Sequence, residues 1–138
     1  MTLVSVLMPV RDDLRTLPDC LESIQKQSLK DWELMVVDDG SSDGSGEFLQ
    51  EIAAKDSRIR VLRERPRGIV AALNSGLAAC AGSYVARMDA DDISHPERLK
   101  MQIRFMERFP QIGLLGTAYH LIDKNGKKLF SKKKFKHW

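Results

Sequence analysis

Four short apolar runs, each followed by a helix-like stretch, constrain the fold of this chain more than any other feature. The runs lie at Val4–Val10, Glu33–Asp39, Ile59–Leu62 and Ser83–Met88. After the first run, leucine and isoleucine recur at steps of three and four residues from position 14 to position 24, the spacing of an amphipathic helix. Strands that alternate with helices predict an α/β domain with a mostly parallel sheet flanked by helices.

The remaining helices are indicated by their start signals. Asp43 is placed to cap a second helix, Gly68–Ala79 is rich in alanine and leucine, and Pro96 suits the first turn of a helix that ends near Arg108. Beyond it, Ile112–Ile122 is apolar and predicts an extended segment. The sequence Lys-Asn-Gly-Lys at 124–127 predicts a hairpin-type turn.

Length and composition exclude several classes of protein. The chain has 138 residues, of which 43% are hydrophobic and 30% charged, so it has the size and balance of one ordinary globular domain. No apolar run reaches the roughly 18–20 residues of a membrane-spanning helix, and the N-terminus lacks the basic start of a signal peptide. Cys20 and Cys80 fit neither a disulfide framework nor a metal-site spacing, which indicates buried thiols. We expect a cytoplasmic protein, with peripheral contact to the inner membrane face as a second option.

The net charge of +3 is unevenly distributed. Residues 124–138 contain seven lysines and no acid, whereas residues 1–123 carry 15 basic and 19 acidic side chains. We therefore expect a domain over 1–123, incomplete at its C-terminal side, and a basic, flexible tail over 124–138. Such a tail is most often solvated, although it suits nucleic acid, anionic lipid or an acidic partner. The acidic body gives no support for nucleic-acid binding.

Polar clusters follow three of the predicted strands. They are Pro9–Asp12, Asp38–Asp43 and Asp89–Asp92. Because ligands of open parallel sheets bind at the carboxyl ends of the strands, these clusters mark the predicted site.

The spacing Asp89-x-Asp91 is the most informative of these patterns. Mg²⁺ and Mn²⁺ prefer carboxylate oxygens and often bridge one or two protein carboxylates to substrate phosphates. The competing interpretation is that Asp92 or Ser94 caps the following helix and that the other acids are solvated.

Three further positions have both a binding and a structural interpretation. Asp39, at the end of a strand, suits hydrogen bonding to the N–H of a pyrimidine or guanine base, or it organises its loop. Arg67 and Gly68 open a helix whose free N–H groups favour an anion, or Arg67 is solvated. Asn74, inside an apolar helix, suggests a hydrogen bond to a loop or ligand.

Other nucleotide and hydrolase motifs are missing from the sequence. It contains no G-x-G-x-x-G dinucleotide loop, no Walker P-loop and no G-x-S-x-G nucleophile. A receiver-type signalling domain also gathers acids at strand ends, but the lysine that it needs after a later strand is missing.

The four motifs together resemble the nucleotide-binding half of inverting GT-A glycosyltransferases of family 2. The segments that carry the resemblance are Val4–Asp12, Trp32–Asp43, Gly68 with Ala72–Gly76, Ala81–Asp92 and Pro96–Leu99. They occur in the family order and span residues 3–123. The resemblance implies a GT-A fold, a nucleoside-diphosphate-sugar donor, a divalent cation (Mn²⁺ or Mg²⁺) and sugar transfer with inversion.

The resemblance also implies roles for individual residues. Pro9, Val10 and Arg11 would line the base pocket, with Arg11 standing where an aromatic residue is common, and Asp39 would bind the base. Asp89 would lie near the ribose and donor sugar and contribute to the metal site, in which Asp91 would be the principal ligand. The other nucleotide-sugar-binding positions would be Asp12, Gly68, Asn74 and Ala90. An acid that accepts a hydrogen bond from the pyrimidine N3–H favours a UDP-sugar as the donor, and donors based on GDP or dTDP are the alternatives.

No catalytic residue is assigned in this chain. In the family the catalytic base is an acid of the C-terminal half, whereas every acid here lies at or before Asp123, so we expect the base beyond residue 138. Two hypotheses follow: a glycosyltransferase that acts on an unknown sugar, lipid or polysaccharide acceptor, or a truncated module that binds nucleotide sugar or a partner without transfer. Exposed apolar surface on a truncated sheet would also favour self-association.

Overall fold

The computed structural model describes residues 2–131 of the chain. Its main feature is a four-stranded parallel sheet in the order β3-β2-β1-β4. The strands are β1 (Val4–Val10), β2 (Trp32–Asp38), β3 (Ile59–Arg63) and β4 (Tyr84–Arg87). Every residue of β2 is buried, as expected for a central strand covered on both faces. The predicted α/β fold with a parallel sheet is confirmed.

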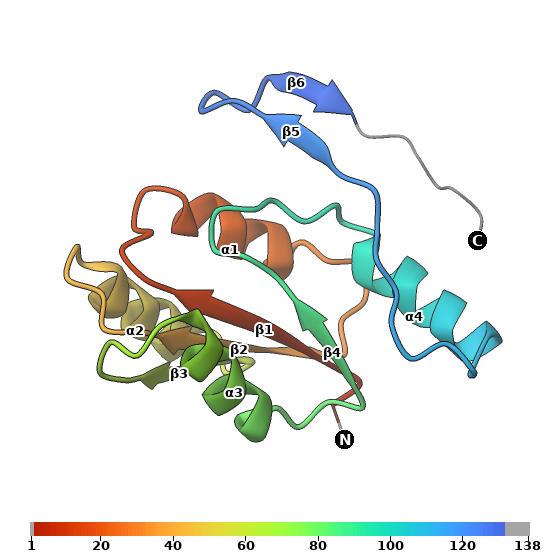
Figure 1. Cartoon of the computed structure of the whole chain (residues 1–138), viewed down its shortest axis with the longest axis horizontal. Helices are drawn as coiled ribbons and strands as arrows, with labels where there is room; N and C mark the ends of the chain where they lie inside the picture. Colours follow the sequence, from red (N-terminus) through yellow and green to blue (C-terminus); the bar gives the residue numbers. More distant parts are fainter. Residues whose placement is uncertain (1, 132–138) are drawn as a thin grey trace. The chain divides into compact units, whose positions relative to one another are not determined.

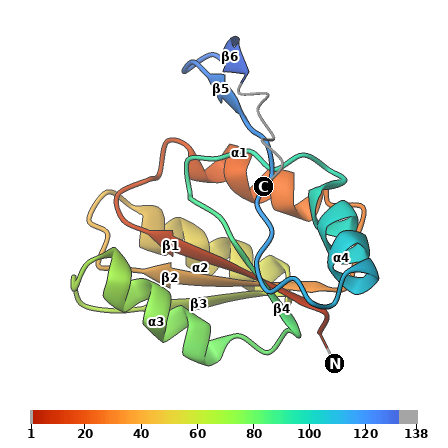
Figure 2. The same cartoon turned by 45° about the vertical axis from the view of Figure 1, so that its right-hand side comes forward.

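Helices connect the strands and cover both faces of the sheet. They are α1 (Leu17–Gln25), α2 (Ser45–Lys55), α3 (Ile69–Ala79) and α4 (Arg98–Arg108). Helix α3 lies on the face opposite to α1 and α2 (Figures 1 and 2). The predicted capping acid Asp43 stands just before the N-cap residue Gly44, and its carboxylate accepts the N–H of Ser45 at 2.9 Å.

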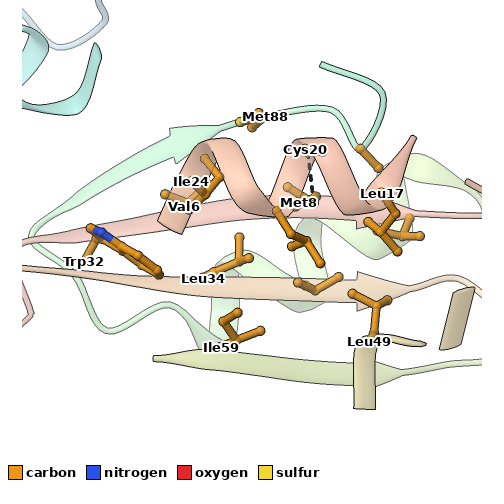
Figure 3. Packing of buried hydrophobic residues seen from close by; sticks show 14 of the residues in the cluster. Val6, Met8, Leu17, Cys20, Ile24, Trp32, Leu34, Leu49, Ile59 and Met88 are labelled. Carbon is orange, nitrogen blue, oxygen red and sulfur yellow. Dashed lines mark hydrogen bonds between the residues drawn. The ribbon is translucent and has the colours of Figure 1, made fainter. Parts of the chain in front are cut away.

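The larger hydrophobic core lies between the sheet and α1 and α2. Alternate residues of β1 and β2 point into it, among them Met8 and Leu34, and meet the inner face of α1, including Leu17 and Ile24 (Figure 3). Leu49 of α2 and the buried residues of α4 belong to the same core. The apolar spacing read from the sequence therefore corresponds to the buried stripe of α1.

The smaller core lies under α3. Leu7 and Val37 contact this helix where it carries Ala72 and Gly76. A Cβ at Gly76 would stand 2.3 Å from Leu7 Cδ1, so glycine is what allows the helix to approach the sheet this closely.

The two cysteines are free thiols in the structure. Cys20 is buried within α1, as expected, and burial raises the pKa of its thiol to about 12. Cys80 follows the last residue of α3 and is half-buried. Both thiols are therefore protonated at neutral pH.

The chain divides into two compact units, and the boundary in the sequence lies between residues 103 and 104. The second unit contains an antiparallel hairpin of β5 (His120–Ile122) and β6 (Lys128–Ser131), whose turn confirms the hairpin predicted at 124–127. Of the segment expected to be extended over 112–122, only the last three residues form a strand. The expected boundary at residue 123 falls inside this hairpin, and the part of the basic tail at 132–138 lies outside the described residues. Within residues 2–131, no helix has the length and apolar character needed to cross a membrane.

Candidate functional site

The order of the strands creates a crevice beside the carboxyl end of β1. From β1 the chain runs through β2 to β3 on one side and then returns through α3 to β4 on the other. In open α/β sheets, ligands bind at such a switch point, outside the carboxyl ends of the strands.

A pocket of about 310 Å³ lies there. Its walls come from the end of β1, the end of β2, the first turn of α3 and the segment after β4. The lining residues are Pro9, Val10, Arg11, Asp13, Asp39, Gly68, Ile69, Ala72, Asp89, Ala90 and Asp91. Eight of the ten positions predicted from the sequence are therefore brought together, from segments up to 82 residues apart.

Asp12 and Asn74 are the two predicted positions outside the lining. Asp12 joins two loops, because its N–H donates to Ser41 Oγ at 3.0 Å and its Oδ1 accepts the Ser42 N–H at 2.7 Å. It adopts φ 55°, a left-handed conformation that aspartate tolerates better than most residues. Asn74 is exposed on α3.

Asp39 connects the end of β2 to the start of α3. Its Oδ1 accepts the N–H of Arg67 at 2.7 Å, and its Oδ2 accepts the N–H of Gly68 at 2.9 Å. Arg11 Nη1 lies 3.5 Å from the same Oδ2. The Arg67 hydrogen bond, with help from Gly68 and Arg11, lowers the pKa of this buried carboxyl, which is therefore ionised at neutral pH. The loop-organising interpretation of Asp39 holds, and the residue also lines the pocket.

The side chain of Arg67 does not line the pocket. Its Nη2 lies 2.6 Å from Glu64 Oε2 and donates to Ser75 Oγ at 3.2 Å. The solvated interpretation of this arginine is therefore closer to the structure, while its backbone N–H contributes to the site through Asp39. At Gly68, φ is +89°, a conformation that favours glycine and that turns its N–H toward the carboxylate.

The segment after β4 carries a concentration of negative charge. Asp89 forms a two-pronged ion pair with Arg87, with N–O distances of 2.5 and 2.6 Å. Asp91 is exposed at the pocket. Partial loss of hydration raises the pKa of Asp92, and the charges of Asp91 and Asp89 raise it further. Burial raises the pKa of Asp13, with contributions from Asp91, Asp43 and Asp12.

These carboxylates repel one another, and their oxygens suit a hard divalent cation. Asp13, Asp89 and Asp91 line the pocket, and the predicted pair Asp89 and Asp91 could hold such a cation, with the remaining ligands supplied by substrate phosphate and water. Within residues 2–131, no group of three or more His, Cys, Asp or Glu side chains is already gathered as a metal site. Two protein carboxylates are sufficient for the magnesium-type sites that also bind phosphates.

Three lining residues were not predicted from the sequence. Asp13 directly follows Arg11 and Asp12, which the sequence predicts as binding residues. Its acidic side chain and its place at the end of β1 would have been sufficient to predict it as well. Ile69 and Ala72 lie on the first turn of α3 and look like ordinary helix positions. Their place in the pocket follows from the way α3 packs on the sheet.

The parallel sheet with helices on both faces has the GT-A fold. Residues 5–137 match glycosyl transferase family 2, and the chain belongs to this family.

Among curated relatives, the chain is 39% identical over 115 residues to the amylovoran biosynthesis glycosyltransferase AmsE of Erwinia amylovora. That match covers 80% of this chain and 42% of AmsE. The chain spans less than half the length of the curated relatives that it matches.

Two solved structures share the fold. The Staphylococcus aureus TarS fragment 1–349, solved in complex with UDP-GlcNAc, superposes with a TM-score of 0.73 at 22% identity, over 91% of this chain and 42% of that one. The mannosyltransferase PcManGT of Pyrobaculum calidifontis, solved with GDP-Man and Mn²⁺, gives a TM-score of 0.70 at 25% identity, over 75% and 32% of the two chains.

Proposed function

We propose that this chain binds a nucleoside-diphosphate sugar, with a UDP-sugar favoured, and serves as the donor site of a glycosyltransferase. The single observation that carries the proposal is the pocket at the switch point, where eight predicted positions from four segments meet. The two solved structures support it, since each has the same fold and was solved in complex with a nucleoside-diphosphate sugar.

The roles follow from the walls of the pocket. Pro9, Val10 and Arg11 would hold the base, and a guanidinium can stack on an aromatic ring. The free edge of Asp39 would accept the base N–H, because an ionised carboxylate has room for more than the two N–H groups that it already binds. Gly68 and Ala90 are small or flexible lining residues that leave room for the ligand.

Asp91 and Asp89 would hold Mn²⁺ or Mg²⁺ against the diphosphate. When bound, such a cation supplies positive charge for a departing diphosphate. Because Asp89 is already paired with Arg87, Asp91 is the carboxylate that is ready to take the principal position. Transfer with inversion would also require a base for the acceptor hydroxyl, which we do not assign to a residue of this chain.

A binding module without transfer activity is the second candidate function. The observation that favours it is that most pocket carboxylates already have partners. Asp39 accepts two backbone N–H groups, Asp13 accepts the N–H of Arg11 at 3.2 Å, and Asp89 is paired with Arg87. Release of nucleoside diphosphate from a nucleotide sugar in the presence of acceptors would support the glycosyltransferase. Binding of the nucleotide sugar without release would support the non-catalytic binding module.

The experiment that tests nucleotide-sugar binding is calorimetric titration with UDP, GDP and dTDP, with Mn²⁺ and again with EDTA. We expect Asp91→Asn to weaken metal-dependent binding more than about 10-fold and to leave the circular dichroism spectrum unchanged. The matched control is Asp31→Asn, an exposed acid next to the amino end of β2 that carries the same charge change. Equal affinities for the two variants would contradict the assigned metal site.

Self-association and cellular location are proposed separately. Strand β4 ends the sheet and pairs only with β1 among the described strands, and its Val85 is 44% exposed, so we propose that copies of the chain associate along this edge. A single monomeric species in sedimentation at high concentration would contradict this. The location in the cytoplasm, with peripheral contact to the inner membrane face, is proposed on the sequence alone.

A further inference from the structure

We infer that a buried polar row along helix α1 and just beyond its C-terminal end is a positioning device for the metal-binding segment. The row consists of Cys20, Ser23 and Gln27, and the segment it holds, named here the acid loop, is Asp89–Leu99. The inference rests on the proposed function, since it assigns a role toward the metal that Asp89 and Asp91 would hold. The acid loop runs beside α1 on its way from β4 to α4 (Figure 1).

Gln27 is the centre of the row. Its side chain has no solvent exposure, although it lies just beyond the last residue of α1. Its Nε2 donates to the carbonyl of His95 at 2.8 Å and to Ser94 Oγ at 3.1 Å, and its Oε1 accepts the N–H of Leu99 at 3.1 Å. Gln27, rather than Asp92 or Ser94, therefore accepts this first-turn N–H of α4.

These partners fix the orientation of the amide. The carbonyl of His95 only accepts and the N–H of Leu99 only donates, so a flipped amide would lose both hydrogen bonds. A buried amide without partners is costly, which means that Gln27 and the acid loop hold each other in one arrangement.

Ser23 and Cys20 extend the row toward the acids. Ser23 Oγ accepts the N–H of Ser94 at 3.0 Å, and the Cys20 thiol lies 3.5 Å from the carbonyl oxygen of Asp89. Cys20 and Ser23 lie three residues apart on one face of α1, and Gln27 follows just beyond the end of the helix. They contact the acid loop at Asp89 on one side of Asp91 and at Ser94 on the other.

Contacts on both sides of Asp91 limit how far the aspartates of the acid loop can move apart. The acid loop contains three aspartates in four residues, which repel one another and favour an open arrangement when no cation is bound. Between its two buried apolar residues, Ala90 and Leu99, the loop forms no strand and its Ile93 is 56% exposed, so apolar packing contributes little to the shape of this stretch. Hydrogen bonds to the buried face of α1 and to the buried Gln27 keep Asp89 and Asp91 close to their metal-binding arrangement, as residues behind a metal ligand commonly do.

The test compares two changes in the row with a matched buried control. Gln27→Met keeps the volume but removes the amide, and Ser23→Ala removes one acceptor and is the milder variant. The control is Ser5→Ala, because Ser5 is equally buried and also bonds to a distant part of the chain, with Glu33 Oε1 at 2.6 Å and the Gly82 N–H at 2.8 Å. It lies toward the amino end of β1 and touches no part of the acid loop described above.

Two measurements on the full chain give separate answers. The first is calorimetry with whichever of UDP and GDP binds more tightly. We expect Gln27→Met to weaken nucleotide binding in Mn²⁺ by about 10-fold or more and to change binding in EDTA by less than about 2-fold. We expect Ser5→Ala to change the affinity in neither condition. In hydrogen exchange, we expect faster exchange of residues 89–99 in Gln27→Met and Ser23→Ala than in Ser5→Ala, at matched thermal stability.

Each outcome bears on one proposal. If the wild-type protein binds no nucleotide in Mn²⁺, the proposed function fails. The hydrogen-exchange data still show whether Gln27 and Ser23 hold the acid loop in place. If it binds and Gln27→Met and Ser23→Ala lose no more affinity in Mn²⁺ than Ser5→Ala, the positioning role is overturned. Unaltered exchange of residues 89–99 in both variants overturns it as well.

Discussion

The replacement Asp39→Asn tests whether the site is organised around one buried carboxylate. Asp39 is 3% exposed and accepts two backbone N–H groups, at 2.7 Å from Arg67 and 2.9 Å from Gly68. Asparagine keeps one acceptor oxygen and places an NH₂ group where the other was. One of the two N–H groups then faces a donor in a part of the structure that water reaches poorly.

The size of the effect follows from those two hydrogen bonds. A hydrogen bond to a charged group contributes about 1.5–3 kcal/mol, and an unsatisfied buried N–H costs about 1–3 kcal/mol. We expect Asp39→Asn to lower the free energy of unfolding by about 2–4 kcal/mol and the melting temperature by about 6–15 °C. The Arg11 ion pair adds little, because Arg11 is 53% exposed and its Nη1 lies 3.5 Å away.

The pH dependence gives a second check on the same carboxylate. The pKa of Asp39 in the folded chain is lowered, chiefly by the Arg67 N–H, so its ionised form stabilises the fold. That stabilisation is complete above the unfolded pKa of about 3.9 and is lost as the pH falls through the lower folded value. The difference between wild type and Asp39→Asn should therefore be constant near neutral pH and shrink below about pH 4.

Urea unfolding followed by circular dichroism at pH 7 and at successively lower pH measures this difference. Arg11→Ala is the control, since it removes the exposed ion pair and leaves both N–H groups with their acceptor. A loss below about 0.5 kcal/mol in Asp39→Asn would refute the reasoning, because surface changes typically stay within that range.

Two further predictions concern positions away from the pocket. Asp56→Asn should lower the free energy of unfolding by about 1–2 kcal/mol at pH 7, because hydrogen bonds from Arg58 lower the Asp56 pKa to about 2. The loss should fade as the pH falls from about 4 to 2 in the same urea titrations. Gly76→Ala should cost about 1–3 kcal/mol, because the added Cβ would meet Leu7 at 2.3 Å, and thermal unfolding would measure it. Wild-type stability in either variant would contradict the corresponding contact.

The sheet and the gathering of acids at one edge could be predicted because both depend on local pattern. The apolar runs have strand length, the helices have a three- and four-residue repeat, and parallel strands place their carboxyl ends together. These rules are sufficient to bring Asp39, Asp89 and Asp91 to one pocket, although they lie in two separate segments of the sequence.

The partners of these residues could not be predicted because they depend on packing between distant segments. The N–H groups that Asp39 accepts lie 28 and 29 residues further along the chain. In the sequence, Gln27 is a polar residue near the end of a predicted helix. The neighbouring residues do not indicate that it is buried against a loop 67 residues further along the chain. Asn74 interrupts an apolar helix in the sequence, which predicts a hydrogen bond to a loop or ligand, and in the structure its side chain is exposed on α3.

The charges of the pocket explain why a metal and a diphosphate should bind together. Asp89 and Asp91 repel a diphosphate that arrives alone, and a cation that arrives alone must compete with the Arg87 guanidinium for Asp89. A cation held by Asp89 and Asp91 would offset their negative charge toward a diphosphate, and the diphosphate would add oxygen ligands for the cation, so each ligand would favour binding of the other. Linkage makes this coupling reciprocal: the factor by which Mn²⁺ tightens nucleotide binding is the factor by which nucleotide tightens Mn²⁺ binding. A pocket lined by acids is therefore consistent with an anionic substrate, provided that the acid loop is held where both carboxylates reach the same ion.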